Sequence, residues 1–150
     1  MRVLVINCGS SSVKYQLIET ADGGVPAKGM VERIGFGDSV FTHTCGAVKT
    51  TKTRAVADHT EALSRVLESL VSGEGAVLAG LGEIGAVGHR FVNGGNLFTD
   101  SVVVDDDFLD KIERVLDLAP LHNPANLLGI RASIAAMPDT PQVVVFDTAF

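Results

Sequence analysis

The sequence predicts an α/β fold in which a mixed β-sheet is flanked by helices. Two patterns support this prediction. Residues 2–56 contain several apolar, β-branched segments separated by turn residues, with no helical spacing among them. From residue 58 onward, segments with helical spacing alternate with short apolar runs. With 150 residues, 46% of them apolar and 20% charged, the chain can form one globular domain with a core.

The N-terminal segment predicts a β-hairpin. Arg2–Cys8 is an apolar run typical of a buried strand, and residues 9–12 read Gly-Ser-Ser-Ser, a polar turn. Val13–Ile18 then alternates apolar and polar side chains, as expected for the returning strand.

The later elements follow in an order that favours one architecture. Strands are expected over residues 26–34, 39–43 and 47–56, and a helix over 58–71 with Asp58 or Thr60 as its N-cap. The remaining elements are a strand over 84–92, a glycine turn at 93–95, helices over 105–118 and 124–137 (the second N-capped by Asn123), and a strand over 142–146. This order matches the ribonuclease-H-like lobe of the actin, sugar kinase and heat-shock ATPase superfamily. In that lobe, the tip of the first hairpin faces a nucleotide cleft.

Composition excludes several classes of partner. The formal charge of −6 argues against nucleic acid, which binds a basic face. No apolar run is long enough to span a bilayer, and the N-terminus is a poor signal peptide. Cys8 and Cys45 are too few for a disulfide framework or a zinc site. We therefore expect a cytoplasmic protein without a membrane or nucleic-acid partner.

The tip of the first hairpin is a candidate phosphate site. Asn7 and Gly9 precede three hydroxyls, Ser10, Ser11 and Ser12, and Lys14 lies on the returning strand. Backbone N–H groups of a glycine turn together with serine hydroxyls can surround phosphate oxygens. The alternative is an ordinary Gly-Ser hairpin turn, because the sequence contains neither a lysine-containing P-loop pattern nor a strand–GxGxxG–helix unit.

Three further residues occupy positions suited to chemistry. Arg90 ends a strand and offers a planar fork for a carboxylate or phosphoryl group, although a structural ion pair is an alternative. His122 precedes a helix start, where an anion is favoured; a structural or merely exposed histidine is the alternative. Asp147 ends an apolar strand and could hold magnesium or accept a proton, or simply cap a turn. His43 and His59 have no such setting and are expected on the surface.

Four strings in the sequence resemble one enzyme family. VINCGSSSVKYQL, VGHRFVNGG, APLHNPANLLGI and VVVFDTAF are similar to segments of the acetate kinase and short-chain fatty-acid kinase family. The resemblance runs from residue 2 to residue 150, the whole chain, but less than half of the family's usual length. It implies the same ribonuclease-H-like fold, with this chain as the N-terminal lobe and the second, nucleotide-binding lobe absent.

The resemblance also implies roles for the hairpin tip and the strand ends. Asn7 corresponds to an asparagine near the phosphoryl group and the metal, and Ser10 and Ser12 correspond to the serines of the family's phosphate loop. Arg90 corresponds to the arginine that holds the acceptor carboxylate and the transferring phosphoryl group. Asp147 corresponds to the catalytic aspartate, which is linked to magnesium and to acceptor orientation.

Three more residues correspond to the family's acceptor site. Val92 and Leu121 match part of its apolar pocket for the acceptor's alkyl group, and His122 matches the histidine of its Leu-His-Asn-Pro segment. The implied reaction is Mg²⁺-dependent, reversible transfer of the γ-phosphoryl group of ATP to acetate, which gives acetyl phosphate and ADP. The family resemblance further implies a homodimer.

Alternative functions remain open from the sequence. The chain could be a propionate or butyrate kinase relative, or a non-catalytic domain that acts by association. A sugar kinase or heat-shock-type ATPase is disfavoured, because a neutral sugar gives the Arg90 fork no charge to neutralise. Asn93 departs from the histidine usual in the family, and the chain stops at Phe150 where the family continues. Either a fragment or a truncated gene product is consistent with this, and we expect residues 1–150 alone to be inactive.

Overall fold

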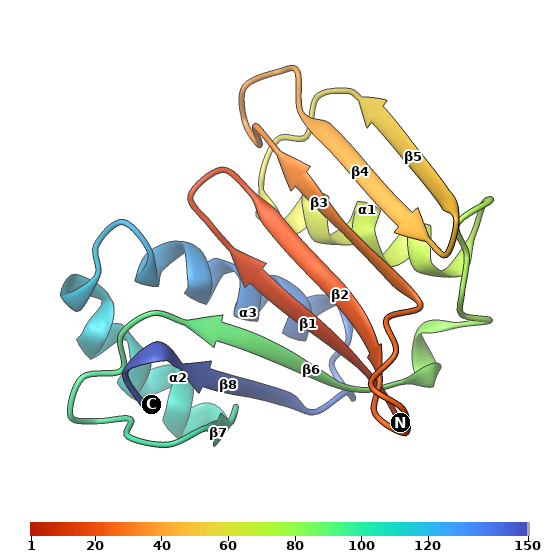
Figure 1. The fold of residues 1–150 in the computed structure, drawn as a ribbon. Helices are drawn as coiled ribbons and strands as arrows, with labels where there is room; N and C mark the ends of the chain where they lie inside the picture. Colours follow the sequence, from red (N-terminus) through yellow and green to blue (C-terminus); the bar gives the residue numbers. More distant parts are fainter. Residues whose placement is uncertain (150) are drawn as a thin grey trace.

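The computed structural model describes residues 1–149; Phe150, where the resemblance ends, lies outside the described residues. The described part is built from eight strands, three α-helices and three short 3₁₀ segments (Figure 1). The strands are β1 (Arg2–Cys8), β2 (Val13–Glu19), β3 (Ala27–Glu32), β4 (Val40–Cys45), β5 (Val48–Thr53), β6 (Ile84–Phe91), β7 (Val102–Val103) and β8 (Gln142–Phe146). The helices are α1 (His59–Val71), α2 (Asp106–Ile112) and α3 (Asn123–Ala136), and the 3₁₀ segments are Leu81–Glu83, Glu113–Leu118 and Asp147–Ala149.

All eight strands form one mixed sheet in the order β5-β4-β3-β2-β1-β6-β8-β7. Strands β1 to β5 pair in an antiparallel meander, whereas β6 lies parallel to both β1 and β8. The parallel pairs need crossover connections, which α1 and the α2–α3 region supply. The predicted mixed sheet with flanking helices, of the ribonuclease-H-like type, is confirmed.

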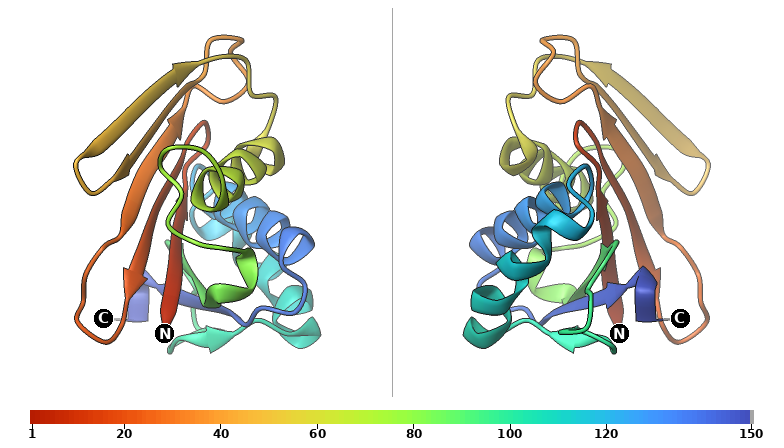
Figure 2. Two further views of the ribbon diagram at one scale, coloured as in Figure 1. Left: turned by 90° about the vertical axis from the view of Figure 1, so that its right-hand side faces the viewer. Right: turned by 90° about the vertical axis from the view of Figure 1, so that its left-hand side faces the viewer.

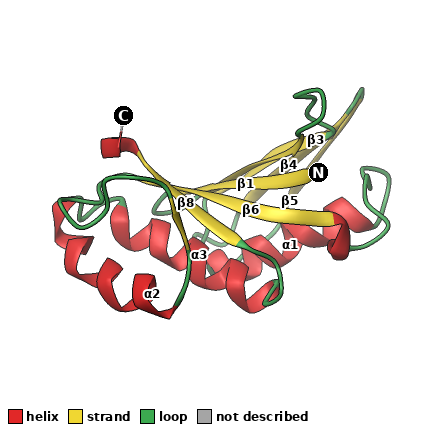
Figure 3. Ribbon diagram, turned by 90° about the horizontal axis from the view of Figure 1, so that it is seen from below, coloured by secondary structure: helices red, strands yellow, loops and turns green. Residues whose placement is uncertain are grey.

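The helices cover one face of the sheet and leave the other open (Figures 2 and 3). Two apolar clusters fill the space between sheet and helices. One joins β1–β3 to α1 and includes Leu4, Tyr15 and Leu70; the other lies under β6 and β8 and contains Phe91, Phe98, Phe108 and Phe146. Among residues 1–149, no helix combines the length and apolar character that crossing a membrane requires.

Several element boundaries differ from the sequence prediction. Asp105 is the N-cap of α2, accepting a hydrogen bond from the Phe108 N–H at 2.7 Å, and the predicted helix over 105–118 tightens into a 3₁₀ segment after Ile112. His122, and not Asn123, occupies the N-cap position of α3. Asp58, one of the two predicted caps of α1, does accept from the Glu61 N–H at 2.8 Å. The two-residue strand β7 was not predicted.

The prediction that His43 and His59 lie on the surface is wrong, because both are buried. The His43 ring lies on the helix-covered side of β4, where its Nε2–H donates to the Gly75 carbonyl at 2.9 Å and its Nδ1 accepts from the Tyr15 hydroxyl at 2.5 Å. The His59 Nε2–H donates to the Gly9 carbonyl at 2.7 Å. Each imidazole is buried because it satisfies polar groups that the chain brings together from distant positions.

Candidate functional site

Three parallel strands end at one edge of the sheet. Ile6 of β1 lies beside His89 of β6, and Phe91 of β6 lies beside Phe146 of β8. The carboxyl ends of β1, β6 and β8 therefore meet, as Figure 1 shows by their arrowheads. Loops at such an edge are free of ladder hydrogen bonds, so open α/β sheets bind ligands there.

Four of the residues singled out from the sequence lie on the open face at this edge. Strand alternation buries Ile6, His89 and Phe146 under the helices and turns their neighbours Asn7, Arg90 and Asp147 the other way. Lys14 is opposite Asn7 in the β1–β2 register and shares its face. We call Asn7, Lys14, Arg90 and Asp147 the strand-end site.

Arg90 and Asp147 form a bidentate ion pair across the ends of β6 and β8. The Arg90 Nε donates to both carboxylate oxygens, at 3.0 and 3.1 Å, and Nη2 donates to Oδ2 at 2.6 Å. This hydrogen bonding raises the pKa of Arg90, so the guanidinium stays charged. The side chains are 51% and 41% exposed, so both groups remain accessible to a ligand. The ion pair predicted as the alternative for Arg90 thus joins it to another site residue.

The predicted phosphate turn, residues 9–12, is held by one contact of its own and by two from outside the hairpin. The Gly9 N–H donates to the Ser12 carbonyl at 2.9 Å within the turn, and the Ile34 N–H donates to the Ser11 carbonyl at 3.0 Å from outside it. His59 holds the Gly9 carbonyl from α1. Ser10 is exposed, whereas Ser11 and Ser12 are half-buried. The turn is therefore fixed in position, and the exposed Ser10 lies at its tip.

Two buried asparagines of α3 connect the strand ends, and only one of them was noted in the sequence. The Asn126 side chain donates to the Cys8 carbonyl at 2.7 Å and accepts from the Val92 N–H at 3.1 Å, which links β1 to the residue after β6. Asn123, expected only as a cap, donates to the Asn93 carbonyl at 2.9 Å and accepts from its N–H at 3.2 Å. Their occurrence at i and i+3 on one helix face was the available signal.

The turn after β6 depends on glycine and on a residue that the sequence analysis passed over. Gly95 has a φ of 58°, and a Cβ on Gly94 would lie 2.8 Å from both the Phe146 ring and the Phe98 carbonyl. The Thr148 hydroxyl accepts from the Gly94 N–H at 3.2 Å. Asn93, the departure from the family pattern, accepts from the Gly95 N–H at 2.9 Å and so stabilises the turn.

The predicted acceptor residues lie at the same edge but are not enclosed. Val92 is half-buried and Leu121 is 78% exposed. His122 is exposed at the N-cap position of α3, one residue before Asn123. Among residues 1–149, no side-chain hydrogen bond or ion pair joins these three residues to the Arg90–Asp147 pair. An alkyl pocket around Leu121 would need further groups to close it.

The oxygen donors at this edge suit a metal ion that a bound substrate also coordinates better than an ion held by protein side chains alone. Among residues 1–149, no three His, Cys, Asp or Glu side chains gather to hold a metal ion. The strand-end site offers one carboxylate, on Asp147, and one amide, on Asn7. Magnesium usually binds through one or two carboxylates, several waters and substrate phosphates. This donor set therefore fits a magnesium ion that arrives with a nucleotide.

Comparison with known sequences gives a consistent result. The model of the Acetokinase family matches residues 2–150. The chain is 53% identical to acetate kinase from Thermoanaerobacterium thermosaccharolyticum and 53% identical to acetate kinase from Thermotoga maritima, in each case over 100% of its own length. It spans only 38% and 37% of these relatives.

Comparison with solved structures gives the same grouping. Acetate kinase from Porphyromonas gingivalis superposes with a TM-score of 0.95 at 43% identity, over 99% of this chain and 38% of that one. A propionate kinase from Francisella tularensis superposes with a TM-score of 0.89 at 37% identity, over 99% of this chain and 37% of that one.

Proposed function

This chain belongs to the acetokinase family, and from that membership we propose that residues 1–150 form the N-terminal lobe of an acetate kinase. The observation that carries the proposal is the bidentate Arg90–Asp147 pair, exposed at the ends of β6 and β8. Because the chain spans 37–38% of the curated relatives it matches, the proposed enzyme needs a second lobe that supplies the nucleotide pocket.

The proposed reaction is the reversible transfer of the γ-phosphoryl group of ATP to acetate. An acetate oxygen forms a bond to the γ-phosphorus while the bond between that phosphorus and the bridging oxygen of ADP breaks, which gives acetyl phosphate and ADP. Such transfers need alignment and charge neutralisation rather than covalent help from the protein. Charged groups already fixed at a strand end can supply both.

Each site residue has a proposed part in this reaction. The Arg90 fork holds the acceptor carboxylate and then the transferring phosphoryl oxygens, with Asp147 keeping the guanidinium oriented until substrate competes for it. Asn7, Lys14 and the turn of residues 10–12 bind nucleotide phosphate oxygens. Val92 and Leu121 contact the acceptor's methyl group, and His122 donates a hydrogen bond to the anion.

A magnesium ion is the proposed cofactor, with Asp147 and Asn7 as the residues of this chain that would hold it. When bound with ATP, magnesium neutralises charge on the phosphate oxygens. The oxygen ligands available here, one carboxylate and one amide, match what such an ion takes from protein. The protein is proposed to be cytoplasmic and to form a homodimer. Light scattering of the full-length protein tests the dimer.

The function is tested by measuring acyl phosphate formation from ATP with acetate, propionate and butyrate. The full-length protein containing residues 1–150 should turn over acetate fastest, with a graded decline because each methylene is worth only about 1–3 kcal/mol. Residues 1–150 alone should show no turnover. Turnover by the isolated chain would contradict the two-lobe proposal. Inactivity of the full-length protein with all three acids would contradict the enzyme assignment and favour a non-catalytic domain.

A further inference from the structure

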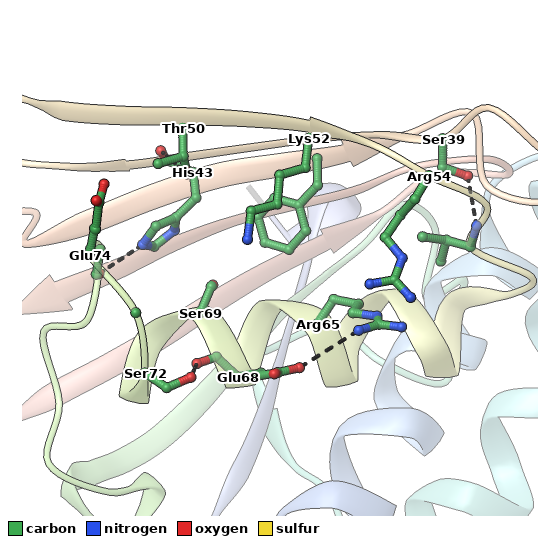
Figure 4. A pocket seen from close by; sticks show the side chains of 14 residues that line it. Ser39, His43, Thr50, Lys52, Arg54, Arg65, Glu68, Ser69, Ser72 and Glu74 are labelled. Carbon is green, nitrogen blue, oxygen red and sulfur yellow. Dashed lines mark hydrogen bonds and ion pairs between the residues drawn. The ribbon is translucent and has the colours of Figure 1, made fainter.

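A hollow lies on the helix-covered side of the sheet, away from the strand-end site. It has a volume of about 500 Å³ and separates the β4–β5 hairpin from α1 (Figure 4). Pockets for small molecules generally have volumes of this order. We call this space the hairpin pocket; its walls come from Phe41, Thr50, Lys52, Arg54, Val56 and Arg65 with neighbouring residues.

The side of β5 that faces α1 carries cationic side chains instead of the usual apolar ones. Lys52 is opposite Phe41 in the β4–β5 register, and Thr50 is opposite His43. Opposite residues of an antiparallel pair share a face, and Phe41 and His43 face the core. Thr50 and Lys52 therefore face α1, and Figure 4 shows the Arg54 side chain pointing the same way. Sheet faces that pack on a helix are normally apolar.

Three cationic side chains line this pocket: Lys52, Arg54 and Arg65. Arg65 of α1 faces Lys52 and Arg54 across it (Figure 4). Arg65 has carboxylate partners, Glu61 at 3.6 Å and Glu68 at 3.9 Å. Within residues 1–149, Lys52 and Arg54 have no carboxylate within 4.0 Å. Two unneutralised cations beside a third repel one another until an anion joins them.

The pocket also contains apolar and hydroxyl groups. Phe41 is half-buried and Val56 is buried, so they form an apolar surface beside the cations. The Ser69 side chain points from α1 into the same space (Figure 4). Glu68 and Glu74, the acidic residues of the wall, lie at its edges, and Glu68 is engaged by Arg65. Lys52 and Arg54 are themselves exposed, so solvent and a ligand can reach them, and they border this apolar surface.

We propose that the hairpin pocket binds a phosphomonoester that carries an apolar or aromatic body. The phosphate lies between Lys52, Arg54 and Arg65, where two guanidinium groups and an ammonium group match its charge and oxygens. The body of the ligand packs against Phe41 and Val56. The pocket contains none of the strand-end residues, so this binding does not depend on the proposed kinase activity.

Protection of individual lysines from acetylation shows where the anion binds. The full-length protein is treated with a lysine-acetylating reagent with and without phenyl phosphate, and modification of each lysine is measured by mass spectrometry. Phenyl phosphate should protect Lys52 about tenfold while leaving Lys111 on α2 unchanged. Lys49 and Lys28, on the opposite face of the sheet, report on binding there. Protection of those two lysines without protection of Lys52 would overturn the proposal.

Calorimetric titration with phenyl phosphate tests the named cations. The variant Lys52→Gln/Arg54→Gln should bind at least about tenfold more weakly, because two charge-assisted contacts are lost. The control Lys111→Gln/Arg114→Gln removes the same two charges elsewhere and should bind as the parent does. Both titrations are repeated with Arg90→Gln, which weakens the strand-end site and should not alter the result.

Inorganic phosphate measures the contribution of the apolar wall. It should bind at the same place but more weakly than phenyl phosphate, since it has no body to pack on Phe41. Equal loss of binding in the Lys52→Gln/Arg54→Gln variant and its control would show that the loss reflects the overall charge of the protein, and would contradict binding at the hairpin pocket. No binding of phenyl phosphate by the parent protein would overturn the proposal outright.

Discussion

Where β1, β6 and β8 end, the polar groups on the two sides of the sheet differ in exposure: those on the helix-covered side are buried, and those on the open side are exposed. On the helix-covered side, Asn126 of α3 and His89 of β6 are buried and hydrogen-bonded to other groups of the protein. On the open face, Arg90 and Asp147 are exposed and contact each other. Burial makes an amide or imidazole costly to leave unpaired, whereas an exposed pair can exchange its partner for a ligand.

Two neighbouring residues of β6 illustrate this contrast between the faces. His89 and Arg90 are one peptide apart, yet strand alternation sends one under α3 and the other to the open edge. Substitutions on the covered face should change the free energy of unfolding. Substitutions on the open face should change turnover instead.

The largest effect is expected on the covered face, for Asn126→Ala. The Cys8 carbonyl and the Val92 N–H would both lose their buried partner. Each unsatisfied buried group costs about 1–3 kcal/mol, so the free energy of unfolding should fall by about 3 kcal/mol. Chemical denaturation measures this loss. Asn96→Ala, at an exposed asparagine, is the matched control and should change stability little. Equal effects of the two substitutions would contradict the role of Asn126 in stabilising the strand ends.

On the open face, Arg90→Lys keeps the charge but loses the planar fork. In the proposed full-length enzyme we expect kcat to fall about 10²-fold, which corresponds to about 2.7 kcal/mol, because the aligned electrostatic contact is lost. The melting temperature should stay near that of the parent, since exposed ion pairs contribute about 1 kcal/mol or less.

Arg131→Lys is the control for this substitution. Arg131 is also half-exposed and contacts a carboxylate, that of Glu113, at 2.9 Å, but far from the strand ends. It should leave both turnover and melting temperature unchanged. A large drop in melting temperature for Arg90→Lys with normal turnover would return Arg90 to a structural role and erase the contrast between the two faces.

Sequence alone was sufficient for features that depend on local pattern. The hairpin, α1 with its Asp58 cap, and β8 followed by Asp147 are confirmed because alternation, helical spacing and capping are written in adjacent residues. The sequence also predicted that Arg90 and Asp147 lie at strand ends, whereas the parallel pairing that brings these strand ends to one edge with Asn7 is known from the structure.

Features that depend on distant contacts were beyond the sequence. His59 holds Gly9 from fifty residues away, and Asn126 holds Cys8 from further still. Local pattern can place two asparagines on one helix face, but it does not identify the distant group that each side chain contacts. The cationic wall of the hairpin pocket was missed for a related reason. The inward direction of Lys52 becomes visible only through its register with Phe41.

The smallest expected effect concerns His89, whose surroundings make stability depend on pH. Its Nε2–H donates to the Gln142 side-chain oxygen at 2.7 Å, and the Ser133 hydroxyl donates to the same oxygen at 2.8 Å. Burial lowers the pKa of His89 from 6.5 to about 4. The unfolded chain therefore binds a proton that the folded protein excludes between these two pH values.

The sign of the effect follows from that difference in proton binding. The stability that neutral, buried His89 contributes is present above pH 6.5 and is lost as the pH falls toward about 4. Between pH 7 and pH 5 we expect a loss of about 2 kcal/mol from this group, since each unit of pKa difference is worth about 1.4 kcal/mol. Denaturation curves of the parent and of His89→Gln, recorded in the same buffers, separate this loss from the titration of other groups. The variant starts less stable but should lose about 2 kcal/mol less than the parent over this interval. Parallel curves would show that His89 is protonated equally in the folded and unfolded chains, and would contradict the burial that places it opposite Arg90.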